Sequence, residues 1–144
     1  MALVNFSTIK ELISGKDTSE DIEVLFKEVL LLVLARATRV DSNVEAIEVH
    51  HIQKAMKDVT GGEFSEGDIR TAASSEIYET QSLARTLSNA ARKLSSQHRV
   101  TILACLAGLI RIDSSIRYQE LEFFDHVATA LKASPSEIAG LSEG

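Results

Sequence analysis

The chain has 144 residues, of which 44% are hydrophobic, and a net charge of −6. This length suits one domain with its own core, and a single cysteine excludes an internal disulfide. An acidic balance without clustered Lys or Arg argues against nucleic acid and anionic membrane surfaces as partners. The longest apolar runs, residues 29–35 and 102–110, fall short of the ~20 residues of a membrane span. With no secretory signal visible, we expect a cytoplasmic protein without membrane insertion.

Helical spacing of apolar residues starts near the amino terminus. Phe6 and the apolar residues that follow it predict a short helix that ends at Gly15. Thr18, three residues before Asp21, is a start signal for a long helix that reaches about residue 38. Its second half is apolar on every side, so we expect other helices to surround it.

A third helix is predicted by a capping box, in which Ser42 and Glu45 satisfy the free amides of a helix start. It should cover residues 43–59. The glycines at 61–62 provide its end, since glycine readily adopts the left-handed conformation that terminates helices.

The middle of the chain predicts two more helices. Ser65 with Asp68 marks the start of one that continues through residues 69–73. Residues 74–82 are polar and fit no clear pattern. A second helix, ending near residues 95–96, follows from an apolar stripe at Leu83, Leu87, Ala91 and Leu94.

The carboxyl-terminal third predicts the remaining helices. Residues 97–112 form a second long apolar helix, and Ser115 starts the next one. A final capping box at residues 134–137, with proline at the first helical position, predicts a short last helix. The helix that begins at Ser115 is expected to point four apolar residues inward: Leu121, Phe124, Val127 and Leu131.

The two halves of the chain resemble each other at an offset of 72 residues. Residues 39–42, Arg-Val-Asp-Ser, fall on residues 111–114, Arg-Ile-Asp-Ser. We therefore predict an all-α fold of about eight helices, in which two helical repeats are related by pseudo-twofold symmetry. Residues 1–18 form an amino-terminal helix and linker, and residues 19–144 form a single domain. Its repeats lie at about residues 24–70 and 96–141.

Four acidic residues recur with this repeat and are the candidate site. Asp41 and Asp113 occupy the turn after each long apolar helix, and Glu48 and Glu120 follow seven residues later. Carboxylate oxygens suit hard divalent cations such as Mg²⁺ or Ca²⁺, although the spacing is not that of an EF-hand. The alternative, which is the more common role of acids at such positions, is capping of helix amides.

Other residues give no enzyme signature. Glu48 and His51 form the Glu-x-x-His unit of di-iron bundles, but Phe123 replaces the second histidine. Cys105 lies in an apolar run and is expected to be inert. We expect the four histidines, His50, His51, His98 and His126, to be solvated or hydrogen-bonded at the surface.

This pattern resembles the TerB-like family, which is linked to bacterial tellurite resistance. The resemblance covers roughly residues 24–141 and is anchored on residues 35–48 and 107–120. It implies a small, helical, cytoplasmic protein with no known catalysed reaction, and a metal held by Asp41, Glu48, Asp113 and Glu120. Family members usually have Asp-Gly in the turn, whereas Ser follows Asp here in both copies and lacks glycine's freedom at positive φ.

Three functions remain open from the sequence. The first is a non-enzymatic stress-response module with a divalent cation at the acidic turns. Its partners would be proteins, with a membrane-associated complex or a homo-oligomer compatible with the sequence. The second is a purely structural protein–protein interaction domain with no metal, and the third is an enzyme that uses Glu48 and His51 at a metal centre.

Overall fold

The computed structural model describes residues 6, 8–10, 22–38, 46–74, 82–111 and 118–133. The described part of the chain is helical and contains no strand, which confirms the all-α prediction. Its helices are α2 (Ile22–Ala37), α3 (Ala46–Thr60), α4 (Glu66–Ala73), α6 (Leu83–Ala91), α7 (Ser96–Arg111) and α8 (Tyr118–Ala130).

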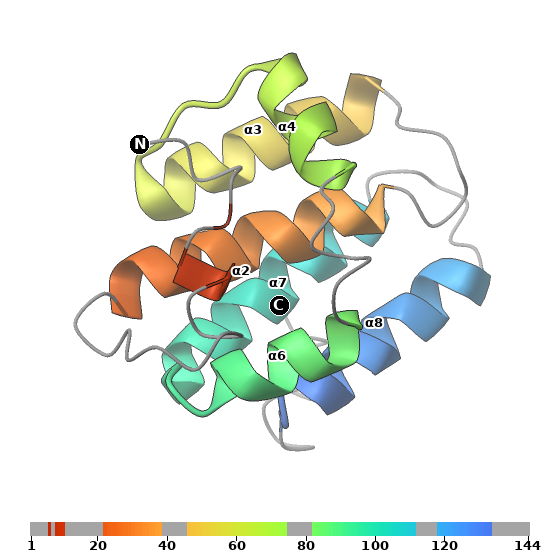
Figure 1. The fold of residues 1–144 in the computed structure, drawn as a ribbon. Coiled ribbons are helices and arrows are strands. Elements are labelled where there is room, and N and C mark those ends of the chain that lie inside the picture. Colours follow the sequence, from red (N-terminus) through yellow and green to blue (C-terminus); the bar gives the residue numbers. More distant parts are fainter. Residues whose placement is uncertain are drawn as a thin grey trace.

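The long apolar helix α2 occupies the centre of the molecule. It lies between α3 and α4 on one side and α6, α7 and α8 on the other (Figure 1), and it contacts all five of these helices. Every residue from Leu25 to Ala35 except Lys27 is buried. The sequence predicted this enclosure because the run has no polar face to present to water.

The amino-terminal segment packs onto α2 through a buried carboxylate. Glu28 is fully buried, and its two oxygens accept hydrogen bonds from the backbone amides of Thr8 (3.1 Å) and Ile9 (2.9 Å). Phe6 and Ile9 are buried as the sequence predicted, although Phe6 has a left-handed backbone (φ 51°) and precedes the helical residues 8–10. The predicted stop at Gly15 lies outside the described residues.

Helix ends in the first half agree with the local signals where they are described. Gly61 has φ +77°, and its amide donates to the Lys57 carbonyl (2.9 Å), so α3 ends as predicted. Ser65 Oγ accepts from the Asp68 amide (3.0 Å) and Asp68 Oδ2 from the Ser65 amide (2.9 Å), which completes the capping box of α4. The signals at Thr18, Asp21, Ser42 and Glu45 lie outside the described residues.

The boundary between α6 and α7 differs from the prediction. The helix expected to reach residues 95–96 ends at Ala91, although Leu94 is still buried beyond it. The reason is a local cap for the next helix. Ser95 Oγ accepts from the His98 amide (3.1 Å), while His98 Nδ1 accepts from the Ser95 amide (3.2 Å). These two hydrogen bonds between Ser95 and His98 cap the start of α7, which therefore begins at Ser96.

One predicted core residue is wrong. Leu121 is 51% exposed, whereas Val127 and Leu131 are fully buried and Phe124 is half-buried. The helical stripe correctly groups these residues on one face. A periodic pattern does not show, however, how much of this face the neighbouring helices cover, and they leave Leu121 exposed. The start at Ser115 and the last capping box lie outside the residues that the structure describes.

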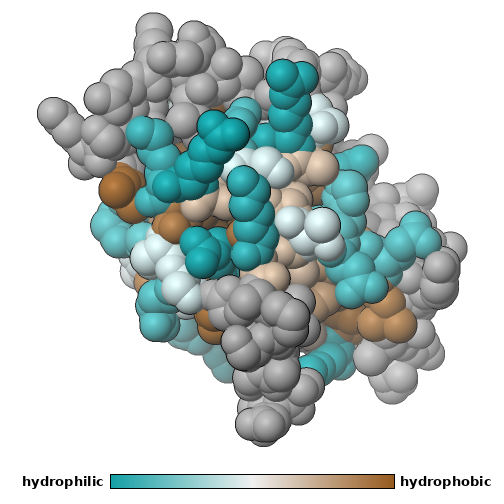
Figure 2. Space-filling model, turned by 90° about the horizontal axis from the view of Figure 1, so that it is seen from below, coloured by the Kyte–Doolittle hydropathy of each residue, from teal (hydrophilic) through white to brown (hydrophobic). Residues whose placement is uncertain are grey.

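Figure 2 shows the face opposite α3 and α4. Among its coloured residues, hydrophilic side chains lie around a weakly apolar centre, with a few strongly apolar spots. The order of helices is compatible with the repeat, since α3 and α8 begin at Ala46 and Tyr118. The pseudo-twofold relation between the repeats stays a prediction.

Candidate functional site

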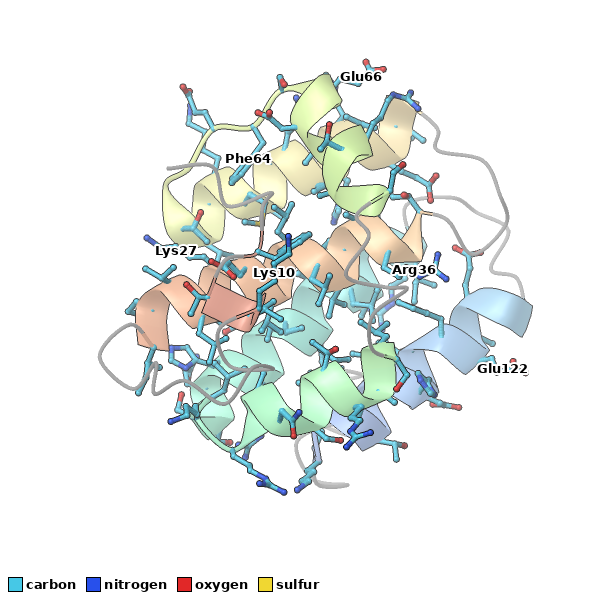
Figure 3. The ribbon with its side chains drawn as sticks, in the orientation of Figure 1. Lys10, Lys27, Arg36, Phe64, Glu66 and Glu122 are labelled. Carbon is cyan, nitrogen blue, oxygen red and sulfur yellow. The ribbon has the colours of Figure 1, made fainter. Side chains whose placement is uncertain are left out.

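The two glutamates of the candidate site occupy matching positions. Glu48 is the third residue of α3 and Glu120 the third residue of α8, and both side chains are half-buried. Both residues interact with other groups of the protein. By contrast Glu122, two residues further along α8, is exposed and points away from the bundle (Figure 3).

The two aspartates of the site, Asp41 and Asp113, lie outside the described residues. Glu48 is an acid in the first turn of α3, and Glu120 is an acid in the first turn of α8. That position lies at the positive end of the helix dipole. Among the described residues no three His, Cys, Asp or Glu side chains gather closely enough to hold a metal ion. The donors that are described are carboxylate oxygens, the type that Mg²⁺ and Ca²⁺ take.

A second polar cluster lies in a groove of about 330 Å³ between α3 and α7. Its walls include His51, Lys54, Asp58, Cys105 and Gly108. The His51 ring lies against the bare Gly108 backbone, since a β-carbon there would come within 3.3 Å of His51 Nε2. The glycine therefore lets α3 bring this ring close to α7.

The environment of this groove favours neutral side chains. Burial lowers the pKa of His51, a backbone hydrogen bond at Cys105 opposes the shift, and the charge of Lys54 adds to it. Burial also raises the pKa of the Cys105 thiol, and the carboxylate of Asp58 raises it further. A thiol that resists ionisation is a poor nucleophile, as the sequence predicted for Cys105.

The histidines have different roles that the sequence did not separate. His98 is hydrogen-bonded as expected, but it also joins two helices. Its ring stacks on Phe26 (centroids 4.5 Å apart, 23° between planes), and Nε2 lies 3.1 Å from the Glu23 carboxylate. Nδ1 accepts from the Ser95 amide, so Nε2 carries the proton and donates to Glu23. His50 is exposed, whereas His51 is half-buried.

Sequence reasoning missed the groove and the buried Glu28. The one signal for Glu28 was its place directly before the apolar run of residues 29–35. No local signal exists for the groove, because the lining residues on its two walls are more than 40 positions apart in the sequence. No helix of the described residues is long and apolar enough to cross a membrane.

Comparison with known proteins gives one finding. A family model described as tellurite resistance protein TerB matches residues 27–143, which is most of the chain. No curated protein and no solved structure matches the chain. The matched residues include all the described helices from α3 to α8 and the four residues of the candidate site. The chain therefore belongs to the TerB family of tellurite resistance proteins.

Proposed function

We propose that this protein is a non-enzymatic stress-response module associated with tellurite resistance, and that it binds a divalent cation through its acidic turns. The ligands would be Asp41, Glu48, Asp113 and Glu120. Membership of the TerB family supports the association with tellurite resistance. The observation that carries the cation site is the matched place of Glu48 and Glu120, each half-buried in the first turn of its helix.

The chemistry of these groups favours a hard cation. Carboxylates supply only oxygen ligands, and such a set suits Mg²⁺ or Ca²⁺ better than soft metals. In each half of the chain the aspartate and the glutamate are separated by only seven residues across one interhelical turn. Each half of the chain can therefore contribute two carboxylate groups, with water or backbone carbonyls as further ligands.

Calorimetric titration with Mg²⁺, Ca²⁺ and Mn²⁺ tests this proposal. We expect binding that weakens by at least about tenfold in Glu48→Gln and in Glu120→Gln, since losing even an outer partner of a metal site costs roughly 10–100-fold. Asp41→Asn and Asp113→Asn should act alike. Glu122→Gln is the matched control, because Glu122 is exposed on the same helix as Glu120 and should leave affinity unchanged.

Two results would refute the cation site. One is the absence of binding at millimolar metal. The other is unchanged affinity when Asp41→Asn and Asp113→Asn are combined, which would move the cation away from these turns.

A purely structural interaction domain is the second candidate. The observation that favours it is the same helix-start position of Glu48 and Glu120, where the helix dipole stabilises a carboxylate without any metal. Under this alternative, Asp41→Ala would lower stability by about 1 kcal/mol as a lost cap. A protein partner would then bind equally well with and without a chelator. We propose that this partner is a cytoplasmic protein.

A further inference from the structure

The groove between α3 and α7 is bordered by a helix face that the rest of the described chain leaves uncovered. Four lining residues from α3 have the spacing i, i+3, i+4 and i+7 of a single helix face: His51, Lys54, Ala55 and Asp58. Lys54 and Asp58 are exposed, and Val59 at the same rim is 37% exposed. This face of α3 therefore points both to the groove and to solvent.

The opposite wall of the groove is built from small residues of α7. They are Ala104, Cys105 and Gly108, and Ala104 is exposed. Because the distance between packed helices depends on the side chains at their contact, small residues let another helix come close to α7. Covering Ala104 and Val59 would also remove apolar surface from water.

The two charged residues of the groove do not pair with each other. Lys54 and Asp58 are four positions apart on α3, yet no ion pair joins these two described side chains. The order of the charges explains this, since an acid four residues before a base is the better arrangement on a helix. Glu66 and Arg70 of α4 have that order and form an ion pair of 2.8 Å. Lys54 precedes Asp58, which is the weaker order.

Both charges act inside the groove. The charge of Lys54 lowers the pKa of His51, and the charge of Asp58 raises the pKa of Cys105. The groove thus carries a positive and a negative group one helical turn apart. A partner of a single charge would match only one of these groups.

A patch of this kind is complementary to itself. In a twofold-symmetric interface, where residue i of one copy contacts residue j of the other, residue j of the first also contacts residue i of the second. When two copies of α3 run antiparallel, Lys54 of each copy comes beside Asp58 of the other. One pair of residues then supplies two ion pairs, and no charge is left facing a like charge.

We propose that the groove between α3 and α7 is the interface of a homodimer, in which the α3 helices of two copies pack antiparallel and Lys54 of each copy pairs with Asp58 of the other. Burial of Ala55, Val59 and Ala104 would supply the apolar contact. The ion pairs would fix the register of the two helices, since charges across an interface contribute more to specificity than to affinity.

Sedimentation equilibrium of the full-length chain tests this proposal, with a chelator present so that the proposed cation site has no influence. The parent protein should approach twice the mass of one chain as its concentration rises. Lys54→Asp and Asp58→Lys should each weaken dimerisation at least about tenfold, because like charges then face each other across the interface. Lys57→Asp is the matched control. Lys57 is exposed on the same helix, pairs with Glu63 (3.1 Å) and does not line the groove, so its replacement should leave dimerisation unchanged.

Mixing the two weakened variants tests the twofold pairing itself. At these positions Lys54→Asp carries two acids and Asp58→Lys carries two bases, so a heterodimer contains two attractive pairs. An equimolar mixture should therefore dimerise at least about tenfold more tightly than either variant alone. Circular dichroism of each variant checks that both are folded before they are mixed.

A further variant leaves the charges unchanged. Ala104→Phe places a large side chain on the α7 wall of the groove and should weaken dimerisation at least about tenfold through a steric clash. A chain that stays monomeric at every concentration would overturn the proposal, in favour of a different occupant of the groove. A dimer that is unaffected by Lys54→Asp and Ala104→Phe would also overturn it, as would a mixture no more dimeric than its two components.

Discussion

Glu28 is a charged side chain buried in the middle of the most apolar helix. Burial of a lone carboxylate is strongly unfavourable, so such a group persists only where donors satisfy it. Here the donors are the backbone amides of Thr8 and Ile9. These amides belong to a helix start and would otherwise be unsatisfied. One residue of α2 thus fixes a segment twenty positions earlier in the chain.

Replacing Glu28 by Gln should destabilise the fold by about 1–3 kcal/mol. The amide nitrogen would face a backbone N–H, so one buried donor loses its acceptor. Urea unfolding followed by circular dichroism measures the change. Glu63→Gln is the control, because its ion pair with Lys57 (3.1 Å) is highly exposed and should contribute less than about 1 kcal/mol. Equal effects of the two variants would contradict this role of Glu28.

His51 should make stability depend on pH in the mildly acidic range. Burial lowers its pKa in the folded protein, while in the unfolded chain the value is about 6.5. The unfolded chain therefore binds more protons below that pH. The contribution of His51 to the free energy of unfolding is complete above pH 6.5. It is lost as the pH falls through the pKa of His51 in the folded protein.

Unfolding free energies measured across this pH range test the assignment. His51→Gln should show a shallower decline toward acid than the parent protein. His50→Gln, which changes an exposed neighbour on the same helix, should keep the parent slope. If His51→Gln kept that slope as well, another group would be responsible for it.

Short-range signals control the ends of the helices. The Ser65–Asp68 box starts α4 and Gly61 ends α3, and both were predicted because each signal acts within four residues of the helix end. The α6–α7 boundary was predicted too late. A histidine took the place of the usual acid in the Ser95–His98 cap, and its ring is also held by Phe26 and Glu23.

Two substitutions at the start of α4 should change the stability of the protein in opposite directions. Ser65→Ala removes the side-chain cap and should cost about 1 kcal/mol. Gly67→Ala adds a β-carbon that meets only Ser65 Oγ at 3.6 Å, and should stabilise the helix by up to about 1 kcal/mol. Thermal unfolding of both variants checks the pair. Opposite signs are expected, and destabilisation by Gly67→Ala would contradict the open space seen there.

The whole molecule depends on α2, which contacts α3, α4, α6, α7 and α8. Leu31→Ala at its fully buried centre should lower the free energy of unfolding by about 2–5 kcal/mol. Hydrogen exchange should show α3 and α7 losing protection together. Ile47→Ala, at an exposed position of α3, should change stability by less than about 1 kcal/mol. Loss of protection confined to one side of α2 would mean that the two sides unfold separately.

The candidate site was predictable only in part. The recurrence of Asp41 with Asp113 and of Glu48 with Glu120 is visible in the sequence, and the structure places both glutamates in first turns of helices. The groove at His51 was not foreseen, because a helix pattern does not determine which residue of another helix it meets. Gly108 matters there only because α3 crosses α7 at that point.

The sequence alone determined the all-α class, the central place of α2 and the helix ends with local caps. These properties follow from periodicity and from hydrogen bonds between residues a few positions apart. Only the tertiary structure decided that Glu28 caps residues 8–9, that His98 reaches Glu23 and that Leu121 lies open. Those outcomes depend on contacts between distant segments, whose relative positions are set by the packing of whole helices and not by any local pattern.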